Sequence, residues 1–428
     1  MTARPVFIID GSRTPFLKAR GRPGPFTPVD LAVQCGRPLL LRQPFASDAF
    51  DLVILGCVSV VADEMNPARV AALRLGMGES MSAFTVQINC GSGMQSIDTA
   101  YRYIQDGVCD LVLAGGTDSL SHSPLVFRRN AVEWYAALAG ARSLWPRVKA
   151  SAGMRPSMFK PVIGLERGLT DPIVALNMGQ TAEVLAHVFH ISRRDADQYA
   201  VESQLKLARA QTEGYFAGEL EPAFARDGKA YDYDDGVRPD SSVEALAKLR
   251  PAFERPWGKV TPGNSSQITD GASWVILASE AAVREHRLAP RAVIVDSAWS
   301  ALDPSLMGLG PVLSSSEILK RRNLGLGDIE LWEINEAFAA QVLACLAAWQ
   351  DDTFCRDVLH LAGAAGTIDR GKLNVDGGAI GLGHPVGASG NRIVLHLVNA
   401  MMRLGRKRGI ATECIGGGQG GAMLIEAA

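Results

Sequence analysis

The chain has 428 residues, of which 47% are hydrophobic and 21% are charged, a balance that excludes a disordered chain and a charge-rich coiled coil. Its net charge of −2 argues against a dedicated nucleic-acid-binding protein, and its length predicts two or three packed units. Seven Cys without a Cys-x-x-Cys pair favour free thiols in a reducing compartment over a disulfide framework. No apolar stretch reaches the roughly 20 residues that span a bilayer, so we expect a cytoplasmic protein.

The first third of the chain alternates short apolar runs with an amphipathic stretch. Strands are predicted at 6–9, 52–56, 84–88 and 110–114, and a helix at 94–104, where apolar residues recur at helical spacing. A strand, a glycine turn, a helix and a second strand form a βαβ unit, which predicts a layered α/β fold.

The middle of the chain differs in charge from the rest. Segment 124–167 carries eight Lys or Arg against two Glu, a net charge of +6, and interleaves them with Trp, Tyr and Phe. Residues 178–214 are predicted to be helical, with Ser192 and Asp195 forming a capping-type start. We predict that residues 124–251 form an inserted loop domain.

The last third repeats the plan of the first. Strands are predicted at 330–334 and 410–414, with a helix at 337–349 and a second helix that runs from Gly387-Ala-Ser-Gly390 to Gly405. Both thirds contain a glycine turn, a helix, a strand and a glycine pair in that order, which indicates an internal duplication. We therefore predict one half over residues 1–123, continued by 252–285, and a second half over 286–428.

The sharpest local motif is Asn89-Cys90-Gly91-Ser92-Gly93. The cysteine falls between a strand and a helix N-terminus, where free backbone N–H groups and the helix dipole favour a thiolate nucleophile. We expect the glycines to let a substrate approach the backbone closely. From this motif alone, a buried structural Cys in a tight turn is an equally good interpretation.

Three further motifs lie at similar junctions. His384 stands in a glycine-rich loop before a helix, as a candidate base, and Cys414 ends a strand that enters glycines. Asn335 lies between a strand and a helix and is either an N-cap or a polar group facing a site. Gly416-x-Gly-x-x-Gly421 has the spacing of a dinucleotide loop, but only seven residues follow it, so that interpretation fails. His187 and His190 lack further ligands, so no metal site is predicted.

Two thiols, a base and an amide at the ends of strands would meet at one edge of an α/β sheet, where sites form. This set suits acyl transfer that includes a carbanion step.

The motifs resemble those of the thiolase family, and the similarity runs nearly from end to end. It implies a duplicated five-layer α-β-α-β-α fold with an inserted loop domain, and the activity of a 3-ketoacyl-CoA thiolase or acetyl-CoA acetyltransferase with a ping-pong mechanism. The strings that carry the resemblance are 89–93, 178–183, 249–253, 263–266, 335–339, 378–390 and 414–420.

The resemblance implies a role for each catalytic position. Cys90 would be the acylated nucleophile, His384 would activate it, and Cys414 would be the acid and base that handles the proton alpha to the thioester. Asn335 would hold a water in one oxyanion hole, while the backbone N–H groups of Cys90 and Gly416 would form the other.

The resemblance also implies that coenzyme A and acyl-CoA are substrates, and that neither a permanently bound cofactor nor a metal is needed. Ser266 and Arg238 would contact coenzyme A, and Met178, Phe253 and Phe338 would line the pantetheine and acyl channel. A homodimer or homotetramer is expected, without a nucleic-acid partner.

Two departures from the family pattern bear on the partners. Many members have His where this chain has Asn177. The long basic segment 124–167 resembles the loop domain of trifunctional-complex β subunits, which implies contact with a hydratase/dehydrogenase subunit or an anionic membrane, although those subunits often have His in place of Asn335.

Two alternatives remain at this point. A ketoacyl-synthase-type condensing enzyme would use one Cys and two His on the same fold, and Cys414 argues against it. A non-catalytic acyl-CoA- or lipid-binding protein on this scaffold is the second alternative.

Overall fold

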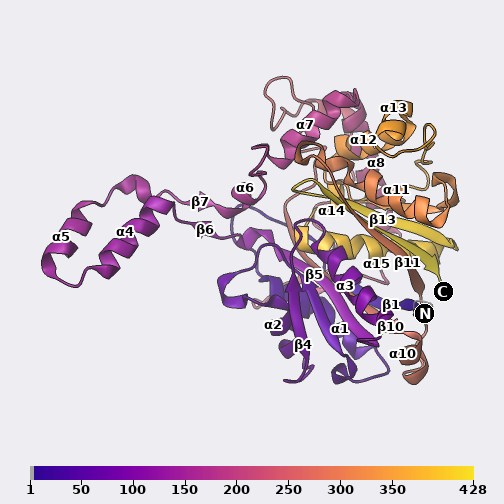
Figure 1. Ribbon diagram of the computed structural model, residues 1–428, viewed down its shortest axis with the longest axis horizontal. Coiled ribbons are helices and arrows are strands. Elements are labelled where there is room, and N and C mark those ends of the chain that lie inside the picture. The colour runs from indigo at the N-terminus through magenta and orange to yellow at the C-terminus, as the bar shows by residue number, and fades with distance from the viewer. Residues whose placement is uncertain (1–3) are drawn as a thin grey trace.

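The computed structural model describes residues 4–428 and builds its N-terminal half around five strands (Figure 1). Their order across the sheet is β4-β3-β5-β10-β1, in which β3 is parallel to β4 and β5, and β10 is antiparallel to both its neighbours. The strands are β1 (Val6–Arg13), β3 (Leu52–Gly56), β4 (Ser82–Val86), β5 (Leu111–Ser119) and β10 (Thr269–Ser279).

The C-terminal half repeats this order as β12-β13-β14-β11. The pairing directions repeat as well, because β12 and β13 are parallel while β14 is antiparallel to both neighbours. Leu373 pairs with Trp332 in parallel, at the place that β4 has in the first half. The internal duplication is therefore confirmed. The strands are β11 (Ala292–Ala301), β12 (Leu331–Ile334), β13 (Arg408–Ile415) and β14 (Gln419–Ala427).

The repeat extends to single residues in β1 and β11, which pair with each other and join the two halves into one sheet. Each strand has a bulge that ends at an Asp, Asp10 in β1 and Asp296 in β11. Each carboxylate accepts the N–H of the next residue at 2.8 Å and binds an arginine, Arg42 or Arg321.

Helices complete five layers, as the resemblance implied (Figure 1). The central layer is formed by α3 (Ser92–Gln105) and α15 (Val386–Leu404), whose apolar side chains share one buried core with the inner faces of both halves. Two more cores lie under the outer helices. Those helices are α1 (Pro28–Leu41), α2 (Pro67–Arg74), α11 (Gly310–Arg322) and α12 (Ala339–Gln350).

Residues 120–268 stand between β5 and β10, which are neighbours in the sheet. The stretch 178–214, predicted as one helical region, consists of α7 (Met178–Val188) and α8 (Arg193–Thr212), separated at His190, whose φ is 54°. Ser192 and Asp195 form the capping box that starts α8. The domain boundaries at residues 123, 251 and 285 stay predictions.

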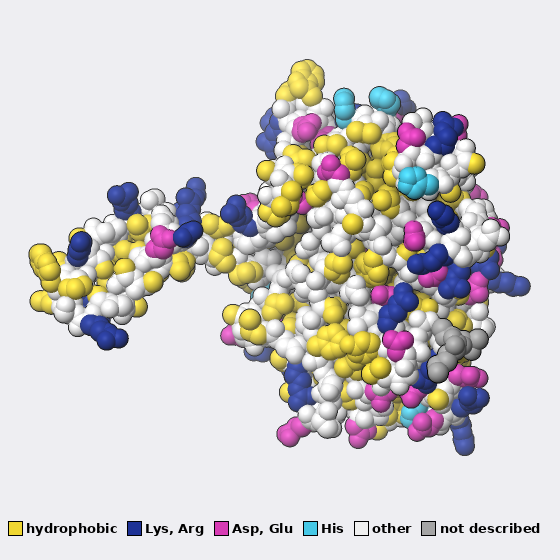
Figure 2. Space-filling view, viewed as in Figure 1, with side chains coloured by type: hydrophobic (Ala, Val, Ile, Leu, Met, Phe, Trp, Pro, Cys, Tyr) yellow, Lys and Arg dark blue, Asp and Glu magenta, His cyan; other side chains and the backbone are white. Residues whose placement is uncertain are grey.

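The basic segment contains two helices that the sequence did not predict. α4 (Arg129–Gly140) and α5 (Leu144–Ala152) form a hairpin that projects from the body of the molecule (Figure 1). The short strands β6 (Leu125–Val126) and β7 (Val162–Ile163) connect it to the body. We call residues 125–163 the arm, and Figure 2 shows basic and apolar side chains gathered along it.

The other elements are short: β2 (Leu17–Lys18), β8 (Ala223–Phe224), β9 (Ala230–Tyr231), α6 (Gly164–Gly168), α9 (Val243–Ala247), α10 (Glu280–Glu285), α13 (Asp352–Asp357) and α14 (Ala379–Leu382). Within residues 4–428, no helix combines the length and the apolar character that crossing a bilayer requires.

Candidate active site

Cys90 lies in a tight turn between β4 and α3. Asn89 takes a left-handed conformation, with φ 46°, which Asn tolerates better than most residues. The Ser92 hydroxyl donates to the Asn89 carbonyl oxygen at 2.7 Å and accepts from the Ile88 N–H at 2.9 Å, and so closes the turn. The turn places Cys90 one residue before the N-cap of α3, where the chain is still accessible. Cys90 is the one cysteine of the seven that is partly exposed.

The Cys90 thiol is not a stabilised thiolate in this structure. Burial of the sulfur raises the pKa of Cys90 to about 11, although a hydrogen bond from the Gly416 N–H lowers it. The backbone donors at this turn lower the pKa, as expected, but desolvation outweighs them in the free protein. A base must remove the proton when the thiol reacts.

The glycines of this turn serve packing. A Cβ on Gly93 would lie 2.7 Å from the Asn391 nitrogen, and one on Gly91 would lie 2.5 Å from the Ile415 side chain. Both are contacts between the two halves. Gly93 therefore lets α3 and α15 come close together, and Gly91 makes room for Ile415 of β13. The expectation that a substrate approaches these glycines stays a prediction.

His384 lies in the loop that leads into α15. The backbone N–H of His384 donates to the Gln267 carbonyl oxygen at 2.9 Å. The ring nitrogen Nδ1 lies 2.6 Å from the Ser389 hydroxyl. That hydroxyl donates to the Pro385 carbonyl oxygen, so its oxygen accepts from Nδ1–H and the lone pair of the imidazole is on Nε2. Nε2 is buried and has no hydrogen-bond partner among the described residues.

The imidazole of His384 is neutral. Burial lowers the pKa of His384 to about 4, and the charge of the Arg392 guanidinium adds to the effect. Val386, two residues further on, lines the same pocket as Cys90. The loop that carries the neutral His384 imidazole therefore reaches the pocket that Cys90 lines.

Cys414 lies at the end of β13 and is buried. Its neighbours include Phe338, Met307 and Met178 in a small apolar cluster. Burial raises the pKa of Cys414 well above its usual value, and the nearby Cys90 sulfur raises it further. Met178 packs against this cluster and also lines the Cys90 pocket, so both thiols lie close to one side chain, and Cys414 holds its proton.

Asn335 is fully buried, and its N–H donates to the Thr412 carbonyl oxygen, two residues before Cys414. Neither polar atom of its side-chain amide has a hydrogen-bond partner among residues 4–428. The helix that follows begins at Ala339 with Phe338 as its N-cap, so Asn335 does not cap it. A buried amide without a partner is costly in a purely structural role.

The residues expected to contact coenzyme A fall into two groups. Met178 lines the Cys90 pocket and has its sulfur against Gly416. Phe253 and Phe338 lie edge to face, with centroids 6.4 Å apart, outside that lining. Ser266 donates its N–H to the Ala337 carbonyl oxygen, next to Phe338.

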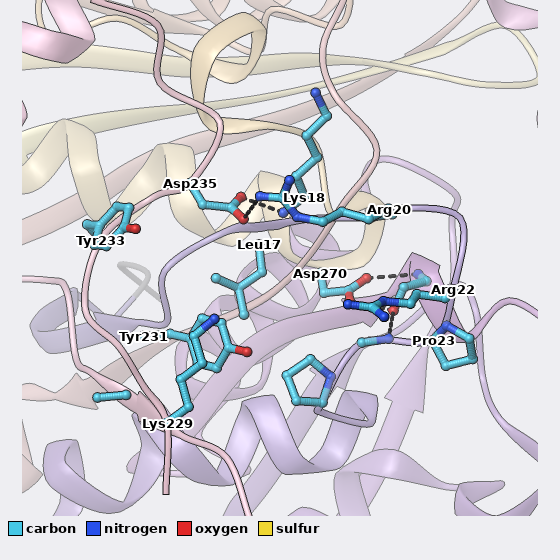
Figure 3. Close-up of a pocket in the computed structure, with 15 residues that line it drawn as sticks. Leu17, Lys18, Arg20, Arg22, Pro23, Lys229, Tyr231, Tyr233, Asp235 and Asp270 are labelled. Carbon is cyan, nitrogen blue, oxygen red and sulfur yellow. Dashed lines mark hydrogen bonds and ion pairs between the residues drawn. The ribbon is translucent and has the colours of Figure 1, made fainter. Parts of the chain in front are cut away.

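Arg238 lies further away, on a loop whose Gly236 carbonyl oxygen accepts from Gln267. Burial lowers the pKa of Lys18, and the charges of Arg238 and Arg20 lower it further. Lys18 and Arg20 belong to a second cavity of about 550 Å³, which is lined on one side by the loop after β2 and on the other by Tyr231 and Tyr233 (Figure 3). None of the predicted site residues lines this cavity.

Comparison with known proteins decides the family. The matching family models are "Thiolase, N-terminal domain" over residues 6–281 and "Thiolase, C-terminal domain" over residues 288–427. The chain belongs to the thiolase family. This membership favours the thiolase interpretation over the ketoacyl-synthase alternative.

Several relatives match this thiolase over its whole length. The mitochondrial 3-ketoacyl-CoA thiolase of Bos taurus is 38% identical and covers 99% of this chain and 98% of its own. The beta-ketoadipyl-CoA thiolase of Pseudomonas aeruginosa is 37% identical and covers 99% of each.

Two solved structures share the fold. Human mitochondrial 3-ketoacyl-CoA thiolase in complex with CoA has a TM-score of 0.84 at 37% identity, covering 99% of this chain and 98% of its own. The Bacillus anthracis acetyl-CoA acetyltransferase has a TM-score of 0.85 at 34% identity, and the match covers 100% of this chain and 99% of that chain.

Three residues that shape the site of this thiolase were not assigned a role from the sequence: Asn89, Asp118 and Ser389. The Asn89 side-chain amide donates to the Gly416 carbonyl oxygen at 2.8 Å and joins the Cys90 turn to the loop after β13. Asp118 accepts from the N–H groups of Ser59 and Gly387, and so joins the His384 loop to the first half. Asn89 and Ser389 stood inside the quoted motifs without a role, whereas nothing in the sequence around Asp118 signals its partners.

Asn177, which stands where many thiolases have His, caps α7. Its side-chain oxygen accepts from the Gln180 N–H at 2.9 Å in a capping box. Its place beside Met178 therefore has a structural explanation.

Proposed function

We propose that this thiolase is an acyl-CoA:acetyl-CoA C-acyltransferase that works by a ping-pong mechanism through an acyl group on Cys90. Thiolytic cleavage of a 3-ketoacyl-CoA and the reverse Claisen condensation of acetyl-CoA are the two directions of one reaction. The observation that carries the proposal is that a partly exposed cysteine, Cys90, and a buried one, Cys414, lie on either side of the Met178 side chain.

In cleavage, the Cys90 sulfur attacks the 3-keto carbon after losing its proton to Nε2 of His384. The C2–C3 bond breaks, its electron pair stays on C2 of the departing acetyl-CoA, and the acyl group remains on Cys90 as a thioester. Cys414 gives its proton to that carbanion, which agrees with the raised pKa of its thiol. In the second half-reaction the coenzyme A thiol gives its proton to the Cys414 thiolate and its sulfur takes the acyl group, while the released Cys90 thiolate recovers its proton from His384.

Two sets of donors would stabilise the oxyanions. The Gly416 N–H already points at the Cys90 sulfur and, with the Cys90 N–H, would bind the oxygen of the acyl-cysteine. The partnerless amide of Asn335 would hold a water that binds the thioester oxygen of the acetyl unit.

Coenzyme A would bind as a substrate, with no permanently held cofactor. Ser266 and Arg238 would contact it, and Met178, Phe253 and Phe338 would line its channel. Phe253 packs on Gly179 and reaches Phe338, next to Cys414, which supports a continuous apolar path. Arg238 is close enough to Lys18 for its charge to lower the pKa of the lysine, and two neighbouring cations suit an anionic ligand.

We also propose a cytoplasmic homodimer or homotetramer. All seven cysteines are free thiols, which suits a reducing compartment. β4 is the outer strand of its sheet and is partly exposed, which suits pairing with a second copy. The arm would contact an anionic membrane or a hydratase/dehydrogenase subunit.

Separate half-reactions test the assignment of the two thiols. We expect Cys414→Ala to accept acetyl from acetyl-CoA at nearly the normal rate, because that step needs only Cys90, His384 and the oxyanion donors. Condensation of two acetyl-CoA should fall by about 10²–10⁴-fold, the usual contribution of a positioned base. His384→Ala should slow both half-reactions.

Cys355→Ala is the control, since that thiol is buried away from the site. Condensation at the normal rate by Cys414→Ala would refute its role. A purified enzyme that thiolyses no 3-ketoacyl-CoA of any length would instead favour the non-catalytic binding protein.

A further inference from the structure

A pocket of about 520 Å³ opens beside Cys90. The loops after β3, β4 and β5 form one wall, because these parallel strands end at the same edge of the sheet. Residues 164–178 of the inserted region form the opposite wall, and Val386 and Gly416 complete the pocket from the second half. An acyl group on Cys90 would therefore lie between the two walls.

Apolar side chains from both walls face this space, and the main ones are Val58, Val60, Leu120, Leu165, Leu169 and Ile173. They belong to three segments that are far apart in the chain. A hydrocarbon chain would displace water from them and gain affinity with each added CH₂ group.

The residues that line the pocket include no Lys, Arg or His. The one charged residue among them is Asp171, which is buried and whose Oδ1 accepts the N–H groups of Ile173 at 2.8 Å and Val174 at 3.0 Å. Asp171 thus holds the turn that presents Ile173. A second carboxylate entering here would lose water, find no cation and face the charge of Asp171.

We propose that the acyl group of the preferred 3-ketoacyl-CoA is an uncharged hydrocarbon chain longer than that of acetoacetyl-CoA, and that chains ending in a carboxylate are excluded. The proposal rests on the proposed function, since it takes Cys90 as the acylated residue. It names the substrate class that the pocket selects.

The surface beyond the pocket extends the same preference to longer chains. Pro124 and Gly164 line the pocket and lead directly into β6 and β7 at the root of the arm. Leu125 and Ile163 are directly opposite each other there and are 66% and 44% exposed. Opposite residues of an antiparallel pair project from one face, so both can cover a chain that emerges from the pocket.

A matched pair of substrates tests the charge rule. 3-Ketohexanoyl-CoA and 3-ketoadipyl-CoA have the same carbon chain and differ in a terminal methyl or carboxylate. We expect kcat/KM for thiolysis to be about 10- to 100-fold higher for the methyl compound, since an unpaired carboxylate would be desolvated. From four to ten carbons, kcat/KM should rise by up to about fourfold per CH₂ group.

Ile173→Arg tests the location. Its guanidinium would supply the missing cation at the rim, so the preference for the methyl compound should fall at least about tenfold. Val358→Arg adds the same charge on α13's exposed end, outside the pocket, and should leave the preference unchanged. An unchanged preference in Ile173→Arg would overturn the assignment of this pocket.

Equal or better use of 3-ketoadipyl-CoA, or a maximum at acetoacetyl-CoA, would overturn the proposed substrate class. Mass mapping of Cys90 after brief exposure to acetyl-CoA separates this failure from that of the proposed function. A labelled Cys90 without chain discrimination refutes the inference alone, whereas the absence of label on Cys90 refutes the function itself.

Discussion

At the scale of single residues, accessibility distinguishes Cys90 from the other cysteines. The remaining six thiols are buried, whereas Cys90 is partly exposed and lines a pocket. Acidity does not distinguish it, because burial raises the pKa of Cys90 and the pKa of Cys109 alike to about 11. Reagents should therefore find Cys90 first because they can reach it.

We expect brief treatment with iodoacetamide to modify Cys90 at least about tenfold faster than any other cysteine, because a buried thiol reacts only when the fold opens. Mass mapping of the digested protein measures this. Acetyl-CoA added beforehand should protect Cys90 and leave its acetyl group there. Label on Cys57, Cys109 or Cys345 instead would contradict the assignment.

The neutral imidazole of His384 predicts an unusual pH profile. Because the pKa of His384 is lowered to about 4, the folded protein binds fewer protons here than the unfolded chain between pH 4 and 6.5. The acetylation rate of Cys90 should therefore show no loss near pH 6.5 as the pH falls, and should fall only as pH 4 is approached. Rapid-quench acetylation from pH 5 to 8 measures it, and an inflection near 6.5 would contradict the neutral imidazole.

The same shift affects stability in a defined direction. The contribution of neutral His384 to the free energy of unfolding is fully present above pH 6.5 and is lost as the pH falls toward 4. Between pH 7 and 5, wild type should lose about 2 kcal/mol more unfolding free energy than His384→Gln, which does not titrate. Urea unfolding at both values measures the difference, and equal losses would show that the pKa is not lowered.

At the scale of elements, the arm is the part that projects from the body of the molecule (Figure 1). Four rings, those of Phe127, Trp134, Tyr135 and Phe159, contact one another edge to face or tilted and pack α4 against the chain on either side of the hairpin. The Trp134 indole N–H also donates to the Ala150 carbonyl oxygen at 2.9 Å and joins α4 to α5. Leu144 and Trp145 at the turn between α4 and α5 are about 80% exposed. Basic and apolar side chains on one hairpin suit an anionic surface (Figure 2).

We expect the protein to bind vesicles that contain phosphatidylserine, and to bind them less at high salt, because the attraction is electrostatic. Trp145→Ala should weaken binding severalfold, since an interfacial ring is lost. Trp257→Ala is a matched control, because that ring is 89% exposed but lies outside the arm. Co-sedimentation measures binding.

Deletion of residues 127–159 separates the remaining interpretations of the arm. Lost vesicle binding with unchanged KM for acyl-CoA supports docking, while a raised KM with unchanged vesicle binding supports steering of the anionic substrate. No change in either would show that the arm has neither role.

At the scale of the whole molecule, the central layer makes the two halves one folding unit. A Cβ on Gly390 in α15 would lie 2.6 Å from the Met94 nitrogen in α3, and 2.2 Å from the buried Glu413 carboxyl oxygen. These neighbours cannot move away without shifting β13 or the Cys90 helix.

Gly390→Ala should therefore lower the free energy of unfolding by about 1–3 kcal/mol, the usual cost of overpacking, and both halves should unfold in one transition. Gly140→Ala is the control, because a Cβ there meets nothing within 4 Å. Urea unfolding followed by tryptophan fluorescence measures both. A wild-type midpoint and slope for Gly390→Ala would contradict the close approach of the central helices.

Much of this architecture could be predicted from local patterns. The strand at 52–56 and the helix around 94–104 were confirmed, because apolar periodicity and glycine turns are properties of neighbouring residues. The strand predicted at 84–88 is β4 at 82–86, since its apolar run continues into the turn that holds Cys90. The arm's helices escaped prediction because their charged and aromatic residues carry no clear period.

The amino-acid sequence alone determined the family, the duplication and the identity of the candidate catalytic residues, because each depends on motifs that are contiguous in the chain. The tertiary structure decided what depends on distant segments. Burial, which comes from the packing of both halves, sets the protonation of Cys90, His384 and Cys414 against the local helix dipole. The apolar pocket likewise exists only where loops from both halves and from the inserted region meet, so no single stretch of sequence predicts it.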